Sequence, residues 1–275
     1  MTIEQDVSRH YTHGNLQQAV LNGLKALGRA PEEVRPEDLA AIDEFHMGGT
    51  QATTELADRL DLEQGMTLLD IGSGLGGPAR FFARRYGCQV TGIDVTPEYV
   101  EVARNLTRMV GLESSVTYRV GGATALPFDD GSFDAATLLH VGMNIPDKDR
   151  LFAEAARVLR RGGVFGVYDV MRVGEGELEF PVAWAAGPAT SFVMQPAAYR
   201  RGLETAGFTV ESERSQRDLA VAFFDRLRSR IARSGPPPLG LHILMGADAG
   251  KKIANLIGNL EAGRIAPVEM VCRKR

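Results

Sequence analysis

The sequence predicts an α/β fold in which a doubly wound, mostly parallel sheet carries helices on both faces. From residue 66 onward, short apolar runs alternate with amphipathic segments of helical length. This alternation is typical of parallel strands joined by crossover helices. Glycine and proline stand at many of the boundaries, where the chain must turn. Seven strands are expected, over residues 66–70, 89–94, 116–120, 133–140, 163–169, 208–215 and 265–273.

The segments between the strands carry helix signals. Pro97 opens one amphipathic segment, Asp147 is a candidate N-cap, and Gly87 and Gly111 stand where two helices should end. These signals and the 3.6-residue spacing of apolar side chains define the expected helices. They lie over residues 78–86, 97–110, 148–159, 196–206, 217–233 and 253–260.

Residues 1–65 precede the first strand and predict a helical N-terminal cap. Asn15 can cap a helix over 16–27, and further helices are expected over 36–45 and 50–60. The chain around Tyr11 is expected to be mobile. One domain is therefore predicted in three parts, which are the cap (1–65), a catalytic domain (66–275), and lid insertions within it at about 174–205 and 216–263.

The composition narrows the class of protein. The chain has 275 residues, of which 44% are apolar and 24% are charged, as in soluble globular proteins. A formal net charge of −4 argues against nucleic acid or an anionic membrane as a partner, so a small-molecule substrate is expected and a homodimer stays open. Cys88 and Cys272 have no metal-ligand spacing, which predicts no metal site and a reducing compartment. No signal peptide or long apolar run is found, so a cytoplasmic location is expected.

A glycine-rich loop follows the first predicted strand. Residues 72–77 read GSGLGG and lead directly into a predicted helix. In this strand–loop–helix setting, glycines let the backbone approach a ligand and the helix N-terminus favours negative charge. Asp94 ends the next strand, where a carboxylate can accept hydrogen bonds from two ribose hydroxyls. The loop and Asp94 together predict a ribose-bearing cofactor, although a tight turn beside an edge acid is the simpler alternative.

Asp70 separates two candidate cofactors. An acid two residues before the first glycine would repel the pyrophosphate of NAD. A cofactor with an amino-acid tail fits better, because its ammonium group can meet Asp70 and its carboxylate can meet the loop amides. S-adenosyl-L-methionine has such a tail.

Four motifs make the resemblance to a known family specific. LLDIGSGLGGPARFFA, VTGIDVT, ALPFDDGSFDAA and RVLRRGGVF, in this order, resemble class I S-adenosylmethionine-dependent methyltransferases with a type 11 methyltransferase domain, over residues 66–170. DEFHMGGTQATTELA and HVGMNIPDK further resemble the sarcosine/dimethylglycine N-methyltransferase type. The resemblance implies a Rossmann-like fold and S-adenosyl-L-homocysteine as the product. It implies cofactor binding by Asp70, Gly72, Ser73, Gly74, Gly76, Asp94, Val95, Ala123, Thr124 and His140.

The chain departs from the family at one position. The family often has an Asp just before the alanine that opens the A-x-x-LPF segment, facing the adenine amino group, whereas this chain reads Gly121-Gly122-Ala123-Thr124. Adenine recognition is therefore expected to rest on backbone amides near Ala123.

Candidate substrate residues lie after the strands, because parallel sheets bind ligands beyond their strand C-termini. His140, Met143 and Asn144 follow the fourth strand, and Tyr168 lies near the end of the fifth. His140 and Tyr168 are the candidate catalytic residues, although a base is optional for methyl transfer to an amine. From the cap and lid, we expect substrate contacts from Tyr11, His46 and Trp184, with a role in the core as the alternative for Trp184.

The predicted function is methyl transfer from S-adenosylmethionine to a small molecule, with a lean towards an amine nitrogen. The alternative acceptor is an oxygen or carbon atom of a specialised-metabolite or quinone-like substrate. An NAD-dependent oxidoreductase and a binding module that has lost catalysis are the other two hypotheses.

Overall fold

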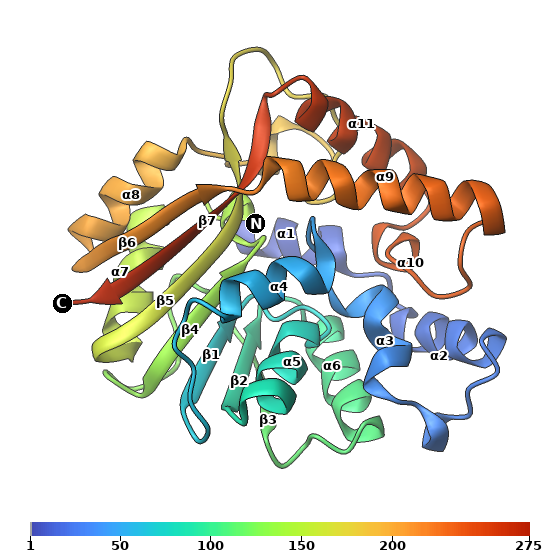
Figure 1. The fold of residues 1–275 in the computed structure, drawn as a ribbon, viewed down its shortest axis with the longest axis horizontal. Coiled ribbons are helices and arrows are strands. Elements are labelled where there is room, and N and C mark those ends of the chain that lie inside the picture. The colour runs from blue at the N-terminus through green and yellow to red at the C-terminus, as the bar shows by residue number, and fades with distance from the viewer. Residues whose placement is uncertain (1) are drawn as a thin grey trace.

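The computed structural model describes residues 2–275, which form a twisted sheet covered by helices on both faces (Figure 1). The strand order is β3-β2-β1-β4-β5-β7-β6, so the chain reverses direction across the sheet between β1 and β4. The strands are β1 (Thr67–Ile71), β2 (Gln89–Asp94), β3 (Val116–Val120), β4 (Phe133–Leu139), β5 (Leu159–Arg172), β6 (Phe208–Ser215) and β7 (Ile265–Lys274). All but β7 run parallel, and β7 lies antiparallel between β5 and β6. The predicted mostly parallel, seven-stranded sheet is confirmed.

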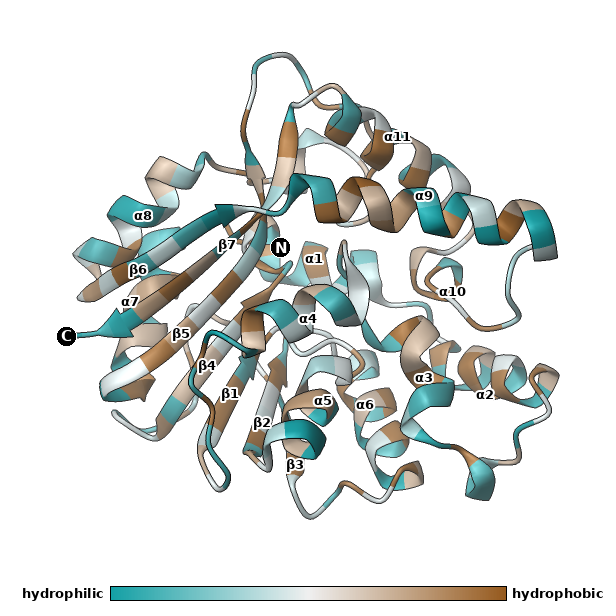
Figure 2. Ribbon diagram, in the orientation of Figure 1, coloured by the Kyte–Doolittle hydropathy of each residue, from teal (hydrophilic) through white to brown (hydrophobic). Residues whose placement is uncertain are grey.

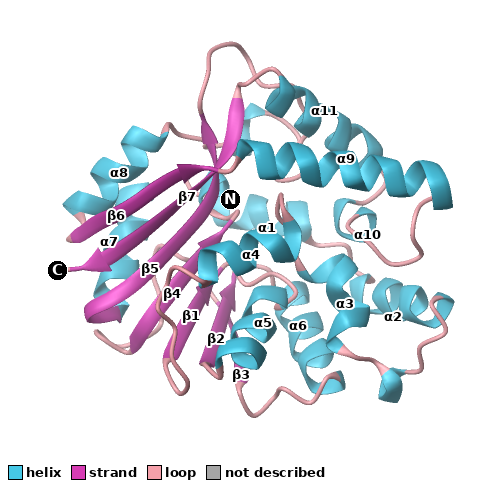
Figure 3. Cartoon of the chain, in the orientation of Figure 1, coloured by secondary structure: helices cyan, strands magenta, loops and turns pink. Residues whose placement is uncertain are grey.

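The central strands are buried on both faces, as Figure 3 shows for the sheet between its two layers of helices. On one face, α4, α5 and α6 pack against side chains such as Leu68 and Val90. On the other face, α7 and α8 pack against side chains such as Leu69 and Phe165. These helices are α4 (Gly49–Ala57), α5 (Gly77–Tyr86), α6 (Pro97–Met109), α7 (Lys148–Val158) and α8 (Pro196–Thr205).

The remaining helices build a second layer beyond the C-terminal ends of the strands. They are α1 (Ile3–Tyr11), α2 (Leu16–Ala26), α3 (Pro36–Asp43), α9 (Arg217–Ser234), α10 (His242–Met245) and α11 (Ala249–Glu261). Short 3-10 turns lie at Pro31–Glu33, Gly142–Asn144 and Pro188–Thr190. The hydropathy colouring of Figure 2 shows teal and brown mixed along α9 and α11 and brown along the central strands. The apolar sides of α9 and α11 join one cluster with Trp184.

Three local expectations differ from the structure. The N-terminal residues are not a loose segment, because α1 begins with a Thr2–Gln5 capping box and buries Val7. The Asn15 side chain makes no capping bond, and the Glu98 carboxylate instead accepts from the Leu16 N–H at 3.0 Å. Helix α8 falls inside the predicted lid at 174–205 but packs on the sheet beside α7.

Strand β5 begins earlier than predicted. Leu159 was expected to end a helix, but it pairs with Phe133 ahead of an irregularity in the β4–β5 ladder. Strand β5 therefore has four residues before the predicted start at Gly163 and three residues after the predicted end at Asp169.

Candidate active site

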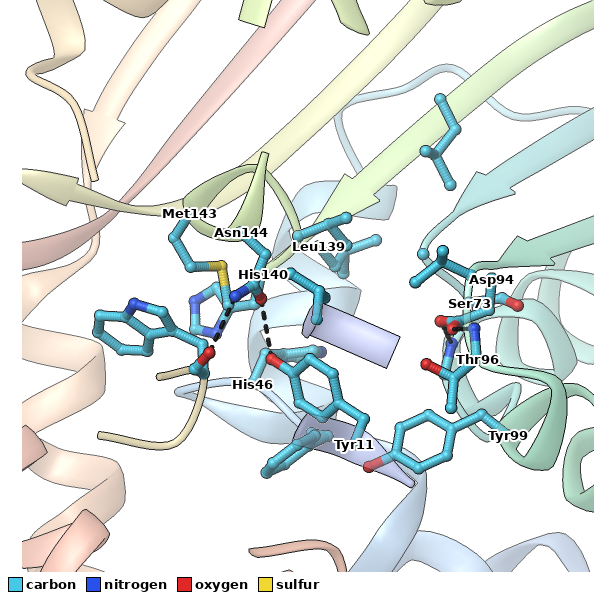
Figure 4. Close-up of a pocket in the computed structure, with 18 of the residues that line it drawn as sticks. Tyr11, His46, Ser73, Asp94, Thr96, Tyr99, Leu139, His140, Met143 and Asn144 are labelled. Atoms are coloured by element: carbon cyan, nitrogen blue, oxygen red, sulfur yellow. Dashed lines mark hydrogen bonds between the residues drawn. The ribbon is translucent and has the colours of Figure 1, made fainter. Parts of the chain in front are cut away.

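One cavity of about 430 Å³ lies at the C-terminal ends of β1, β2 and β4. The loops after these strands form its floor, and α1, the cap and the lid form its walls. Ligand sites of doubly wound sheets occupy this place, where the strand order reverses. In Figure 4 the residues after β1 and β2 lie on one side of the cavity, and His140, Met143 and Asn144 lie on the other.

The glycine loop lies close to the loop after β4. Gly72 has a φ of 74°, and a Cβ built on it would lie 2.2 Å from Val141 Cγ2, so only glycine fits here. The N–H groups of Gly72 and Ser73 both donate to the carbonyl of Ile93, at 2.7 and 3.0 Å. The Gly74 N–H donates to Asp94 Oδ2 at 3.0 Å. The N–H groups of Gly72, Ser73 and Gly74 are therefore paired within the protein, and contact of a ligand carboxylate with the loop amides stays a prediction for the rest of the loop.

Asp94 holds two loops together. Its Oδ2 accepts from Gly74 and its Oδ1 accepts from the Thr96 N–H at 2.8 Å. Burial raises the pKa of this carboxyl, whereas the backbone hydrogen bonds lower it. Each oxygen retains a further lone pair that can accept from a ligand hydroxyl.

Buried polar atoms without partners gather at this cavity. Seven such side-chain atoms occur within residues 2–275, and five of them belong to residues that line the cavity. Leaving such an atom unpaired costs roughly 1–3 kcal/mol, so this concentration marks a site built for a polar ligand. The five are Asp70 Oδ2, Ser73 Oγ, Thr96 Oγ1, Tyr99 OH and His140 Nε2.

Asp70 lies at the end of β1 with one oxygen free. Its Oδ1 accepts from the Thr137 hydroxyl at 2.9 Å, and its Oδ2 has no partner. Burial raises the pKa of Asp70 to about 7, with smaller contributions from Glu44 and Asp94. A cation beside Oδ2 would favour the charged form of this carboxyl.

His140 is held in an unusual backbone conformation at the end of β4. Its φ is 54°, and its ring stacks on Tyr168 with centroids 5.2 Å apart. The Met47 N–H donates to Nδ1 at 3.4 Å, which leaves the proton of the neutral ring on Nε2. Burial lowers the pKa of His140 well below its ordinary value, with a further contribution from His46. His140 thus presents a neutral N–H donor from Nε2, and a role as base requires the other tautomer.

Two predicted site residues do not line the cavity. The Tyr168 hydroxyl donates to the Met47 carbonyl at 2.8 Å, so this side chain supports His140 from behind. Gly76 is the N-cap of α5, and a Cβ there would lie 2.1 Å from Tyr118 OH. Gly76 therefore serves the close packing of helix on sheet rather than contact with a ligand. The other predicted cofactor residues line the cavity.

The predicted substrate residues Tyr11, Asn144 and Trp184 form a connected group. The Tyr11 hydroxyl donates to Asn144 Oδ1 at 2.9 Å, and Asn144 Nδ2 donates to the Trp184 carbonyl at 2.9 Å (Figure 4). Trp184 Nε1 donates to Ser191 Oγ at 2.9 Å. All three side chains line the cavity, together with Met143. Trp184 belongs both to the core and to the lid, since only 2% of it is exposed.

His46 is held within the cap. Its Nε2 lies 2.7 Å from Glu44 Oε2 and 3.0 Å from Thr53 Oγ1, and the Thr53 hydroxyl donates to Glu44 at 2.7 Å. The His46 ring packs edge-on against His140, with centroids 5.6 Å apart. His46 lines the cavity, but its Nε2 is already paired.

Comparison with known protein families finds a match for the part of the chain that forms the floor of the cavity. Residues 69–167 match the family described as the methyltransferase domain. These residues carry a methyltransferase domain.

Two curated relatives are similar to part of this chain. The methyltransferase GfsG of Streptomyces halstedii is 38% identical over 134 residues, which are 49% of this chain and 48% of that protein. The sterol 24-C-methyltransferase of Yarrowia lipolytica is 32% identical over 175 residues, which are 60% of this chain and 44% of that protein. The chain thus matches just under half the length of these curated relatives.

Solved structures share the fold. A protein assigned as a sarcosine dimethylglycine methyltransferase of Galdieria sulphuraria superposes with a TM-score of 0.67 at 22% identity, over 82% of this chain and 85% of that one. The [4+2]-cyclase SpnF superposes with a TM-score of 0.70 at 24% identity, over 100% of this chain and 97% of that one. The cap and lid are therefore part of a fold that recurs around this methyltransferase domain.

Sequence reasoning missed part of the methyltransferase site. Thr96 and Tyr99 follow Asp94 directly, and their place after a strand end was a usable signal. Glu4 and Val7 of α1, and the lid residues of α9 to α11, gave no such signal, because only tertiary packing brings them to the cavity.

Other kinds of site are not found around the methyltransferase domain. Within residues 2–275, no group of three or more His, Cys, Asp or Glu side chains could hold a metal ion. Cys88 and Cys272 are both free and buried. None of the helices in this range is long and apolar enough to cross a membrane.

Proposed function

We propose that this chain transfers a methyl group from S-adenosylmethionine to a small, largely apolar acceptor. One observation carries the proposal: a single cavity joins the polar loops after β1 and β2 to an apolar chamber under the lid. The chamber is formed by Met47, Met143, Val170, Ala183, Trp184, Phe223, Phe224 and Leu256.

The polar side of the cavity fits S-adenosylmethionine. Asp70 Oδ2 would accept from the ammonium group, and Asp94 would accept from the ribose hydroxyls. The unpaired hydroxyls of Thr96 and Tyr99 give further partners for a polar ligand. When bound, this cofactor supplies a methyl group on a sulfonium, which a nucleophile in line with the bond displaces.

The chamber defines the class of acceptor. The charged residues of the cavity wall lie on α1, the cap, the loops after β1 and β2, and the start of α7, whereas the chamber residues are apolar. A sarcosine-like substrate carries a carboxylate, and burying it here without a cation would be costly. The chamber therefore favours an apolar acceptor that reacts at oxygen or carbon, or at an uncharged amine, over an amino-acid amine. The similarity to a sterol C-methyltransferase supports the same choice.

His140 would orient the acceptor within this chamber. Its Nε2–H is the buried donor at the border between the polar loops and the chamber. Donation to an acceptor oxygen would hold the acceptor in line with the methyl group and favour its deprotonated form, whose proton would pass to water before the transfer. The closed lid excludes water, which strengthens such a contact.

The decisive experiment separates cofactor binding from methyl transfer. We expect S-adenosylhomocysteine to bind in calorimetry, and labelled methyl from S-adenosylmethionine to reach apolar alcohols, phenols or amines but not sarcosine. If S-adenosylhomocysteine binds but no acceptor is methylated, the chain would instead be a cofactor-binding module or a cyclase like SpnF. Absence of binding would contradict the proposal.

A matched variant tests the chamber itself. Leu256→Arg places a cation on its wall without changing the polar loops. We expect S-adenosylhomocysteine affinity to be retained and transfer to apolar acceptors to fall.

A further inference from the structure

We propose that Glu4 of α1 recognises the exocyclic amino group of the cofactor's adenine, in place of the acid that the loop after β3 lacks. The inference rests on the proposed function, because it names a residue that reads one part of S-adenosylmethionine. It assigns a specificity role to a helix outside the matched methyltransferase domain.

The carboxylate of Glu4 lies on Gly122. A Cβ built on Gly122 would lie 2.3 Å from Glu4 Oε1, 2.9 Å from Cδ and 3.1 Å from Oε2. Glu4 therefore fills the space that an acidic side chain at position 122 would occupy. The Thr124 hydroxyl donates to Glu4 Oε1 at 3.1 Å, which fixes the carboxylate against this loop.

The adenine would lie at this end of the cavity. Asp94, which would bind the ribose, ends β2, and β3 is the next strand towards the sheet edge. The base would extend from the ribose towards the loop after β3, where residues 121–124 line the cavity. An adenine amino group donates two hydrogen bonds, and a carboxylate is a strong acceptor for them.

Two other charged groups at this end have roles in the helix and loop beside it. Asp147 Oδ1 accepts from the Arg150 N–H at 2.9 Å, as the N-cap of α7. Arg150 Nε donates to the Thr124 carbonyl at 3.0 Å. Glu4 is thus the carboxylate best placed over residues 121–124.

Helix α1 holds Glu4 in place from both ends. The capping box orders its first turn, Val7 is buried, and Tyr11 bonds to Asn144. Adenine recognition would then be coupled to docking of α1, since both depend on the same helix.

Calorimetry with two ligands tests the inference. S-adenosylhomocysteine carries the amino group, whereas S-inosylhomocysteine carries a carbonyl oxygen there that a carboxylate repels. The wild-type chain should prefer the adenosyl ligand. Glu4→Ala should weaken binding of S-adenosylhomocysteine about three- to tenfold, because one exposed charge-assisted hydrogen bond is lost. The same variant should bind S-inosylhomocysteine as tightly as the wild type or more tightly. Glu4→Gln should improve inosyl binding, because its amide can donate to the carbonyl.

Two further variants make the result specific. Gly122→Ala should push the flexible Glu4 side chain away and so weaken S-adenosylhomocysteine binding without removing the carboxylate. In the double variant with Glu4→Ala, the affinity should be close to that of Glu4→Ala alone. Asp6→Ala removes an acid from the same helix at a residue outside the cavity wall, and should leave both affinities unchanged.

The outcomes separate this inference from the proposed function. If wild type binds S-adenosylhomocysteine but Glu4→Ala keeps the full preference for it, the role of Glu4 is refuted and the methyltransferase proposal stands. If wild type binds neither ligand, the proposed function itself fails.

Discussion

The Tyr11 hydroxyl donates a 2.9 Å hydrogen bond to Asn144 Oδ1 and so ties the first helix of the chain to the loop after β4. Asn144 in turn donates to the Trp184 carbonyl in the lid. One polar side chain therefore connects the wall, the floor and the lid of the cavity. Separation of these three parts would widen the cavity.

Tyr11→Phe should loosen this arrangement without emptying the core. A neutral hydrogen bond contributes about 0.5–1.5 kcal/mol, so α1 should exchange amide hydrogens up to about tenfold faster. Hydrogen exchange followed by mass spectrometry measures this over residues 3–11 and 182–191. Tyr86→Phe is the matched control, because its hydroxyl bonds to Asp58 at the surface away from the cavity. Equal exchange in both variants would show that the Tyr11 bond does not hold the helix.

Asp94→Ala should weaken S-adenosylhomocysteine binding by about 1–3 kcal/mol, because buried ribose hydroxyls would lose a carboxylate acceptor. The same change frees the N–H groups of Gly74 and Thr96. Asp94→Asn keeps one oxygen acceptor, so its loss should be smaller. Calorimetry gives both affinities, and an unchanged affinity for the alanine variant would remove Asp94 from the site.

Much of the fold could be predicted from local signals. Strands β2, β3 and β6 begin and end where their apolar runs and flanking residues predict. The positions of Asp94 and His140 at strand ends followed from the same signals. Val167 and Tyr168 face opposite sides of the sheet and β5 continues to Arg172, so Tyr168 packs under α4 and not at the strand end.

The rest of the site depends on long-range packing. The chamber brings Met47, Val170 and Leu256 together, although more than two hundred residues separate the first from the last. Helix α1 carries Ile3, Val7 and Tyr11 at helical spacing, and all three line the cavity. This spacing predicts a docked face, but the segment itself does not show which part of the fold the face contacts, because the folded neighbours set that contact.

His140→Ala should reduce turnover about 10- to 100-fold while changing S-adenosylhomocysteine affinity much less, because it removes the unpaired Nε2 donor that we propose for the acceptor. His140→Gln distinguishes a donor from a base. Its amide can still donate from the place of Nε2 but cannot take up a proton near neutral pH. If His140 acts as a donor, the glutamine variant should keep much more turnover than the alanine variant. If both variants lose the same amount of turnover, and the wild-type pH–rate profile shows that one group must be deprotonated, His140 would instead be the base.

Cofactor affinity should depend on pH through Asp70. Burial raises the pKa of this carboxyl to about 7 in the free protein, and an ammonium group beside Oδ2 would lower it, so binding must release a proton below that pH. The affinity for S-adenosylhomocysteine should therefore fall as pH decreases below 7, by up to about tenfold per pH unit, and level off above about 7.5. Calorimetry in two buffers of different ionisation enthalpy should detect the released proton. In Asp70→Asn the affinity should be weaker and nearly constant between pH 5.5 and about 7.5, because the group that must lose its proton is gone. A wild-type affinity that is independent of pH across this range would place the ammonium group elsewhere in the cavity.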